Sequence, residues 1–252
     1  MARITTIINQ KGGVGKTSTV HALATGLTRK GHKVLLIDTD PQGNLSYAMQ
    51  SDLQSKGLYE AMRTKTSITE LIQHTKQGDI ISSSMLLAGA DFEFTEKGRE
   101  YLLDKALDPI KKQYTHIIID SPPTLGILTV NALVACTDII IPLTADIFAL
   151  QGLSQLSNTI NKVEQFCNKN IKIAGLLICR FSGRSILSRE LKDVIDGKAA
   201  EMKTELYNTF IRDGVAIRES QTQSASVFDY APSSNPAVDY DNFIIEYLNQ
   251  EK

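Results

Sequence analysis

A glycine-rich segment, Lys11-Gly12-Gly13-Val14-Gly15-Lys16-Thr17, lies between two runs of different periodicity. Residues 4–9 before it are apolar and β-branched, which predicts a strand. Residues 16–30 after it have the pattern of a helix that ends at Gly31. Glycines let the backbone fold around phosphate oxygens with its N–H groups pointing inward, and the helix N-terminus adds a favourable dipole. The sequence therefore predicts a phosphate-binding loop after the first strand.

The loop departs from the strict Gly-x-x-x-x-Gly-Lys-Thr pattern at one position, because Gln10 stands where the first glycine is expected. In such a loop Lys16 reaches the β- and γ-phosphates, and the Thr17 hydroxyl ligates Mg²⁺. The alternative is a turn that serves only tight packing, but Gly-Lys-Thr between a strand and a helix is the context that the motif requires. The residues expected to contact a nucleotide are Lys11, Gly12, Gly13, Val14, Gly15, Lys16, Thr17 and Ser18.

Carboxylates follow two further strand-like runs. Asp38 and Asp40 come at the end of residues 33–38, and Asp120 ends the apolar run Ile117-Ile118-Ile119. Next to a phosphate site, one acid of the first pair can hold a Mg²⁺-bound water while the other positions the attacking water. Asp120 is placed to support the metal, so the expected metal residues are Thr17, Asp38 and Asp120. The alternative for the first pair is a turn closed by Asp and Pro.

Strand-like and helix-like runs alternate along the chain, which predicts an α/β fold. We expect a doubly wound, mostly parallel sheet with helices on both faces, in one domain over residues 1–252. In such a sheet ligands bind beyond the carboxyl ends of the strands. The expected strands are 4–9, 33–38, 79–82, 116–120, 138–143 and 171–179, and the expected helices are 16–30, 95–113, 127–135, 149–167 and 186–198, with a polar helical stretch at 44–76 and a closing helix near the end.

Composition narrows the range of functions. The 27 basic and 28 acidic residues leave a net charge of −1, so binding to nucleic acid would need a local patch. No apolar run approaches the ~18 residues of a membrane span, and the N-terminus lacks the apolar region of a signal peptide. Cys136, Cys167 and Cys179 are scattered and the four histidines show no metal spacing, which favours a reducing cytoplasm and no metal cluster.

The chain resembles the ParA/Soj-type partition ATPases, which belong to the deviant Walker A (MinD/ParA) class of P-loop ATPases. The resemblance covers nearly the whole chain, and the second lysine of the loop, Lys11, is the signature of that class. It rests on Asn9-Gln10-Lys11-Gly12-Gly13-Val14-Gly15-Lys16-Thr17, Asp38-Thr39-Asp40-Pro41-Gln42-Gly43-Asn44, Leu87-Ala88-Gly89-Ala90, Ile119-Asp120-Ser121-Pro122-Pro123-Thr124-Leu125-Gly126 and Ala149-Leu150-Gln151-Gly152-Leu153.

This resemblance implies a Mg²⁺-dependent ATPase that forms a homodimer around ATP. Lys11 would reach the nucleotide of the partner subunit, and Asp40 would be the hydrolysis residue, so Lys11, Lys16 and Asp40 are the expected catalytic set. It also implies nonspecific binding of double-stranded DNA in the ATP state, and a ParB-like centromere-binding protein that stimulates hydrolysis. The expected location is the cytoplasm, on the nucleoid, with no membrane binding. No segment precedes the first strand, so the chain resembles the short subclass without an added helix-turn-helix domain.

The charge distribution is compatible with a DNA-binding region. Residues 161–218 hold 11 basic and 7 acidic residues, and residues 219–252 hold 1 basic and 6 acidic residues. By motif position Arg184 and Arg218 match the DNA-binding arginines of Soj-like members, and Arg189 is a further candidate from local charge. The alternative is a solvated face. The segment before Arg218 is two residues longer than in Soj-like proteins and lacks their proline, so the match there is looser.

Several other functions share the phosphate loop. A MinD-like membrane-cycling ATPase would end in a basic amphipathic helix, whereas residues 241–252 carry mostly acidic charges. A small-molecule ATP-dependent ligase of the same fold would not need DNA. A nitrogenase-iron-protein-like reductase would need paired cysteines, and a bacterial tyrosine kinase would need a tyrosine-rich tail. A DNA-coating scaffold with incidental hydrolysis stays open at this point.

Overall fold

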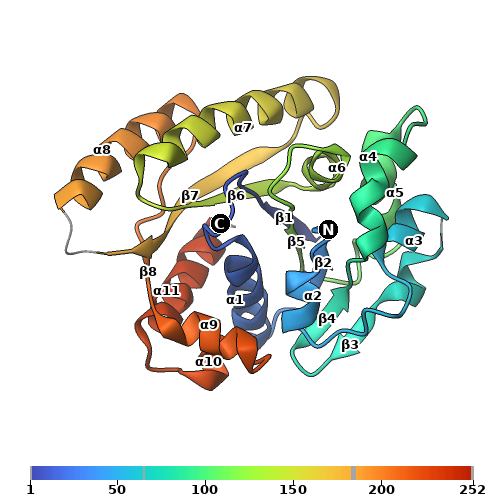
Figure 1. The fold of residues 1–252 in the computed structure, drawn as a ribbon, viewed down its shortest axis with the longest axis horizontal. Coiled ribbons are helices and arrows are strands. Elements are labelled where there is room, and N and C mark those ends of the chain that lie inside the picture. The colour runs from blue at the N-terminus through green and yellow to red at the C-terminus, as the bar shows by residue number, and fades with distance from the viewer. Residues whose placement is uncertain (1, 65, 183–185, 251–252) are drawn as a thin grey trace.

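The computed structural model describes residues 2–64, 66–182 and 186–250, and over these it forms one eight-stranded sheet with helices on both faces (Figure 1). The strand order is β3-β4-β2-β5-β1-β6-β7-β8, and every neighbouring pair is parallel except β3 and β4. The expected doubly wound α/β fold is therefore confirmed. The strands are β1 (Arg3–Ile7), β2 (Val34–Asp38), β3 (Gln73–Thr75), β4 (Gly78–Ile81), β5 (His116–Asp120), β6 (Asp138–Leu143), β7 (Lys172–Phe181) and β8 (Ile211–Arg212).

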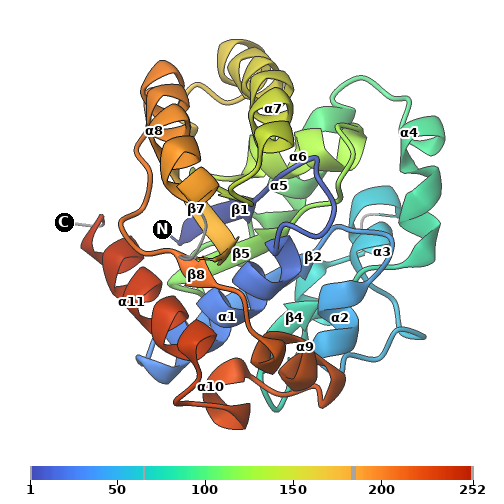
Figure 2. The ribbon, with the colours of Figure 1, turned by 60° about the vertical axis from the view of Figure 1, so that its left-hand side comes forward.

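Two layers of helices cover the sheet (Figure 2). One layer contains α1 (Lys16–Arg29), α2 (Asn44–Ala48), α9 (Val215–Thr222), α10 (Val227–Tyr230) and α11 (Asn235–Asn249). The other contains α3 (Leu58–Arg63), α4 (Ala90–Glu93), α5 (Leu102–Leu107), α6 (Ile127–Ala135), α7 (Ile147–Phe166) and α8 (Ile186–Glu201), with the 3₁₀ turns η1 (Ile68–Leu71), η2 (Met85–Gly89) and η3 (Arg99–Tyr101).

The strands are apolar on both sides because each layer buries its own hydrophobic core against the sheet. In β5, Ile117 and Ile119 contribute to the core under α5, α6 and α7, while Ile118 contributes to the core under α1 and α11. Side chains of a strand point alternately to opposite faces, so a strand covered on both faces needs a continuous apolar run. This requirement explains the unbroken isoleucines of β5 and β6.

The register of the three neighbouring strands β1, β5 and β2 brings their carboxyl ends to one level. Ile7 is the partner of Asp120, and Asp120 is the partner of Asp38 on the other side. The loops that leave β1, β2 and β5 therefore start side by side. This arrangement places the glycine-rich loop next to both acidic strand ends.

The predicted bounds of helices and strands agree best with the structure in the middle of the sheet. β5, α6 and β6 have the predicted bounds, and β1, α1, β2, α7, β7 and α8 differ from prediction by a few residues. The predicted helix 95–113 was wrong, because Gly98 adopts φ 83° and the helical part is limited to η3 and α5. The polar stretch 44–76 is broken into α2, α3, η1 and β3.

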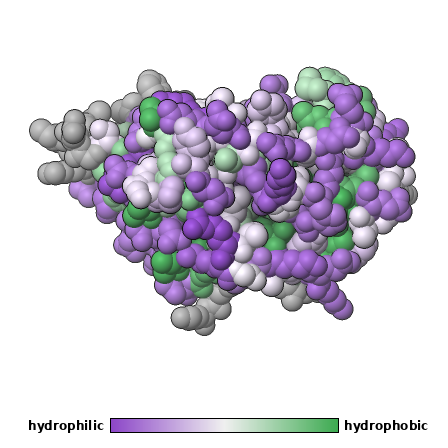
Figure 3. All heavy atoms as spheres, turned by 90° about the horizontal axis from the view of Figure 1, so that it is seen from below, coloured by the Kyte–Doolittle hydropathy of each residue, from purple (hydrophilic) through white to green (hydrophobic). Residues whose placement is uncertain are grey.

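The C-terminal helix packs into the domain as expected. Tyr240, Phe243, Ile244 and Tyr247 of α11 are buried in the core that α1 shares. Within the described residues no helix combines the length and the apolarity needed to cross a bilayer. The face shown in Figure 3 is mainly hydrophilic, and its hydrophobic residues form separate small patches.

Candidate nucleotide-binding site

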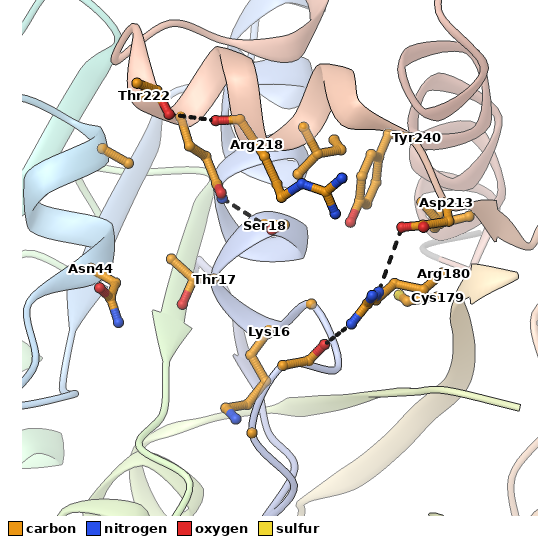
Figure 4. Close-up of a pocket in the computed structure, with 18 of the residues that line it drawn as sticks. Lys16, Thr17, Ser18, Asn44, Cys179, Arg180, Asp213, Arg218, Thr222 and Tyr240 are labelled. Carbon is orange, nitrogen blue, oxygen red and sulfur yellow. Dashed lines mark hydrogen bonds and ion pairs between the residues drawn. The ribbon is translucent and has the colours of Figure 1, made fainter. Parts of the chain in front are cut away.

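A pocket of about 720 Å³ opens at the carboxyl ends of the strands, between the glycine-rich loop and helix α9 (Figure 4). Elements from the whole length of the chain form its wall. They contribute Gly12, Gly13, Gly15, Lys16, Thr17 and Ser18 from the loop and α1, Asp40, Gln42, Asn44, Tyr47 and Ala48 from the segment after β2, Pro123 after β5, Cys179 and Arg180 from β7, residues 211–214 around β8, Ile217, Arg218, Gln221 and Thr222 from α9, and Tyr240 from α11.

The loop has the backbone that a phosphate cradle needs. Gly13 and Gly15 adopt left-handed conformations with φ 74° and 96°, which L side chains rarely adopt. Asn9 holds the start of the loop, because its side chain donates to the Pro142 carbonyl at 2.7 Å and accepts from the Lys11 N–H at 2.9 Å. Gln10 has no left-handed backbone, so the glycine of the strict pattern is not required at that position.

Lys16 lies at the base of the pocket, largely buried. Its ammonium group donates to the Lys11 carbonyl at 3.3 Å. Burial lowers the pKa of Lys16, and the nearby carboxylates of Asp120 and Asp40 partly offset this effect. Because a buried ammonium group gains from a nearby negative charge, binding a polyphosphate at Lys16 would be favourable.

Thr17 and Asp120 form the best candidate for a magnesium site. The Thr17 hydroxyl donates to Asp120 Oδ2 at 2.7 Å, whereas Asp120 Oδ1 is buried and has no hydrogen-bond partner among the described residues. Burial raises the pKa of Asp120 well above its usual range, and the neighbouring Asp38 adds to the rise. An unsatisfied buried carboxylate oxygen beside a hydroxyl and a phosphate loop fits Mg²⁺, which prefers oxygen ligands and usually shares them with substrate phosphates.

No group of three His, Cys, Asp or Glu side chains in the described part of the chain is arranged to hold a metal by itself. A cation at Thr17 and Asp120 would therefore need further ligands from phosphate or water.

Asp38 has a different environment from Asp120. Its carboxylate accepts hydrogen bonds from the Ser46 N–H at 2.8 Å, the Ser46 hydroxyl at 2.7 Å and the Asp40 N–H at 3.1 Å. Burial raises the pKa of Asp38 to about 6 in spite of these bonds. These bonds connect the end of β2 to Asp40 and to Ser46 of α2, so Asp38 has a structural role. Its expected role near the metal, holding a Mg²⁺-bound water, stays a prediction.

Asp40 lines the pocket at the mouth of the loop. Its Oδ1 accepts the Gln42 N–H at 3.0 Å, and its backbone carbonyl accepts the Ser83 hydroxyl at 2.6 Å. These contacts hold the carboxylate and the backbone of Asp40 in place at the wall of the pocket. Its role in positioning water stays a prediction that this geometry permits.

Lys11 is engaged within its own subunit. Its ammonium group forms an ion pair with Asp146 at 2.5 Å and lies 3.4 Å from the Thr144 hydroxyl. Both partners of the ion pair are about one-third exposed, at 37% and 34% of the side-chain surface. Lys11 does not appear among the residues that line the pocket, so an approach to a nucleotide would require this ion pair to open.

The three arginines predicted to bind DNA are described to different extents. Arg184 lies outside the described residues, and Arg189 lies in α8 at a position where the side chain is not described. Arg218 is exposed, and it lines the nucleotide pocket from helix α9. Their contact with DNA stays a prediction.

Sequence reasoning missed the pocket wall opposite the loop. Arg180, Gln221 and Tyr240 come from segments that carry no recognisable motif. One signal was available for Arg180, because it follows the buried run of β7 at the carboxyl end of a parallel strand. The same rule had located Asp120.

A parallel sheet with a phosphate loop after its first strand, a hydroxyl and a buried carboxylate beside it, and a pocket beyond defines a P-loop nucleoside triphosphate-binding protein. The family model described as "AAA domain" matches residues 2–173. Sporulation initiation inhibitor protein Soj from Bacillus subtilis is 35% identical over 246 residues, covering 95% of this chain and 96% of that protein.

Two solved structures with bound ATP analogues are similar to this chain over its full length. The cobyrinic acid a,c-diamide synthase of Mycobacterium smegmatis, with a bound ATP analogue and magnesium, has a TM-score of 0.88 at 30% identity and covers 100% of this chain and 96% of its own. A putative plasmid partition protein of Borrelia burgdorferi bound to AMPPNP has a TM-score of 0.83 at 25% identity, with 100% of both chains covered. The chain belongs to the ParA/Soj family of P-loop partition ATPases.

Proposed function

We propose that this protein binds MgATP in the pocket between the glycine-rich loop and α9 and hydrolyses it slowly to ADP and phosphate. The observation that carries the proposal is the unsatisfied Oδ1 of Asp120 beside the Thr17 hydroxyl and the buried Lys16. These three groups would hold the magnesium ion and the β- and γ-phosphates. When bound, magnesium would supply charge neutralisation at the phosphates.

The hydrolytic step is assigned to residues of this chain. Asp40 would accept a hydrogen bond from the attacking water and orient it toward the γ-phosphate. Gly13, Gly15 and the other loop residues would donate backbone N–H groups to the phosphate oxygens. Since a switch ATPase keeps its site incomplete until a partner binds, intrinsic turnover is expected to be slow.

The wider role that we propose is partition of plasmid or chromosomal DNA. ATP would support a homodimer in which Lys11 leaves Asp146 and contacts the nucleotide of the partner subunit. That dimer would bind double-stranded DNA without sequence preference, with Arg184, Arg189 and Arg218 as candidate contacts. A ParB-like centromere-binding protein would stimulate hydrolysis and release the DNA. We also propose that residues 1–252 act as one domain, in the cytoplasm and on the nucleoid.

The similarity to a cobyrinic acid a,c-diamide synthase structure makes a small-molecule ligase the nearest alternative. Relatives named for chromosome partitioning reach 34% identity over 95% of this chain and 32% identity over all of it, which favours the partition role. Membrane cycling receives little support from α11, because its large side chains Tyr240, Phe243, Ile244 and Tyr247 are buried in the core and, of its apolar residues, only Val238 and Ile245 are exposed.

The first test is the mass of the protein in solution with MgATP, with MgADP and without nucleotide, by light scattering after gel filtration. Asp40→Ala should stay dimeric throughout a run with MgATP, because it retains the ligands for nucleotide and loses the water-positioning carboxylate. Lys16→Ala should stay monomeric in every condition. A wild-type protein that remains monomeric with MgATP, or an Asp40→Ala variant that hydrolyses ATP at the wild-type rate, would overturn the corresponding part of the proposal.

A further inference from the structure

Helix α9 forms the wall of the pocket opposite the phosphate loop. Figure 4 shows Lys16 at one end of the pocket and α9 across the other end. Ile217, Arg218, Gln221 and Thr222 line the pocket, and their spacing of three and four residues places them on one face of the helix. Ala216 and Ser220, in contrast, are buried in the protein. Helix α9 thus presents one charged, two polar and one apolar side chain to the pocket.

Two amide side chains fix α9 relative to the phosphate loop. The Gln221 side chain donates to the Ser18 hydroxyl at 3.0 Å, which ties α9 to the first turn of α1. The Gln77 side chain donates to the Ser224 carbonyl at 3.0 Å and to the Ala48 carbonyl at 2.8 Å. The position of Arg218 at the pocket is therefore a consequence of how its helix is anchored.

Arg218 differs from the two neighbouring arginines of the pocket. Arg212 is held by Asp239, with its guanidinium within 2.7 Å of the carboxylate. Arg180 lies 3.5 Å from the Asp213 carboxylate and 3.4 Å from the Gly13 carbonyl. Among the described residues, the guanidinium of Arg218 has no ion-pair or hydrogen-bond partner, and it extends from α9 toward Ser18 and Tyr240 (Figure 4).

The position of the phosphate-binding residues determines which part of a bound nucleotide lies next to Arg218. Lys16 and Thr17 fix the end that takes the β- and γ-phosphates, so the end below α9 takes the ribose and the base. A guanidinium is planar, carries only donors and stacks on aromatic faces. The fused rings of a purine present a larger face and more acceptor nitrogens than a pyrimidine. Ile217 beside it adds an apolar surface for the same ring.

We propose that Arg218 is a specificity-determining residue that binds the base of a purine nucleoside triphosphate. The inference rests on the proposed binding of MgATP, and it adds a role that the sequence did not assign, since Arg218 was expected to contact DNA. On this basis the loss of Arg218 weakens nucleotide binding before any DNA is present.

The test is isothermal titration calorimetry without DNA, using MgATP and Mg-ribose 5′-triphosphate, which lacks the base. Arg218→Ala should bind MgATP about tenfold more weakly, the equivalent of one to two kcal/mol for a cation–π contact, and should bind ribose 5′-triphosphate within twofold of the wild-type affinity. Arg218→Lys should lie between the two, because it keeps the charge and loses the planar group.

Two controls separate this inference from the proposed function. Arg63→Ala removes an exposed arginine from α3, where its partner is Glu96 at 3.8 Å, and should leave both affinities unchanged. Lys16→Ala should lose both ligands. If Arg218→Ala binds MgATP within twofold of wild type, or loses both ligands equally, the assignment to the base is wrong while the phosphate site stands. If the wild-type protein binds neither ligand, the proposed function itself fails.

Discussion

Two buried carboxylates face each other across neighbouring strand ends in this protein. Asp38 and Asp120 are register partners in β2 and β5, both are inaccessible to solvent, and burial raises the pKa of each. Asp38 is compensated by three hydrogen bonds, whereas Asp120 accepts one and leaves Oδ1 unsatisfied. The ionised form of Asp120 therefore destabilises the nucleotide-free protein. A carboxylate with such a perturbed pKa is typical of a functional site, here one that binds a cation.

This imbalance predicts that Asp120→Asn stabilises the nucleotide-free protein at pH 7.5 by on the order of 2 kcal/mol, because the variant removes a buried charge that Thr17 and Lys16 compensate only in part. The raised pKa means that the folded wild-type protein holds its proton more tightly than the unfolded chain. The cost of the ionised carboxyl is therefore complete above the folded pKa and disappears as the pH falls toward 3.8.

Urea denaturation of both proteins between pH 7.5 and pH 4.5 measures this difference, which should shrink steadily with pH. Asp108→Asn, at an exposed position, is the control and should show no such trend. A variant that is less stable than wild type at pH 7.5, or a difference that does not change with pH, would mean that Asp120 is already compensated.

The ion pair between Lys11 and Asp146 gives a second prediction at this scale. Because both groups are partly exposed, breaking the pair should change the free energy of unfolding by less than about 1 kcal/mol. Asp146→Asn should nevertheless release Lys11 for a partner subunit and lower the protein concentration at which MgATP produces dimers. Sedimentation over a concentration series measures both states, and a dimer constant equal to wild type would show that the ion pair does not hold Lys11 back.

Individual residues were predictable where a short stretch of chain carries the whole signal. Gly13, Gly15, Lys16 and Thr17 act within one turn, so their spacing alone locates the phosphate loop. Tyr240 lines the same pocket although it lies 221 residues after Thr19, whose hydroxyl it contacts. No local sequence pattern identifies Tyr240 as a pocket residue. The ion pair of Lys11 was also not foreseeable, because Asp146 follows a different strand.

At the scale of elements, α1 is the helix on which the site depends, since it begins at Lys16 and packs between the sheet and α11. Gly26 is the closest point of that packing. A Cβ built there would lie 2.1 Å from Ile244 Cδ1 and 3.1 Å from a ring carbon of Phe228. The glycine is required by the close approach of two helices and has no unusual backbone angle.

Gly26→Ala should therefore destabilise the protein by about 1–3 kcal/mol through overpacking, although alanine favours a helix. Gly197→Ala in α8 is the matched control. A Cβ at Gly197 meets no atom of the described residues within 4 Å, and the same replacement there should stabilise by about 0.5–1 kcal/mol. Chemical denaturation of the two variants should give changes of opposite sign. Equal changes would show that α1 and α11 can separate without cost.

Elements in the middle of the sheet were predicted well because a strand buried on both faces must be continuously apolar. The edge strands β3 and β8 carry no such signal, since β3 is a polar run of three residues and β8 has only two residues. The predicted helix 95–113 failed for a local reason. Gly98 adopts a left-handed conformation before η3, and Pro109 follows α5 with no N–H to continue it.

At the scale of the whole molecule, the strand order explains why the pocket draws on distant segments. The loops after β1, β2 and β5 supply the phosphate and metal end, and the segment from β7 to α11 supplies the opposite wall. Composition and element order predicted the sheet and its ligand edge. They did not predict that α9, whose Arg218 was expected to contact DNA, closes the nucleotide pocket.

If this protein is a partition ATPase, the nucleotide in this pocket should control whether the protein binds DNA. The measurement is the affinity for a random-sequence DNA duplex in Mg²⁺ at a fixed ~100 mM salt, because salt governs the strength of phosphate contacts. Wild-type protein is titrated with ATP, with ADP and without nucleotide, beside Lys16→Ala. The wild-type protein should bind the duplex tightly with ATP alone. Equal binding in all three nucleotide states, or binding in none of them, would contradict it.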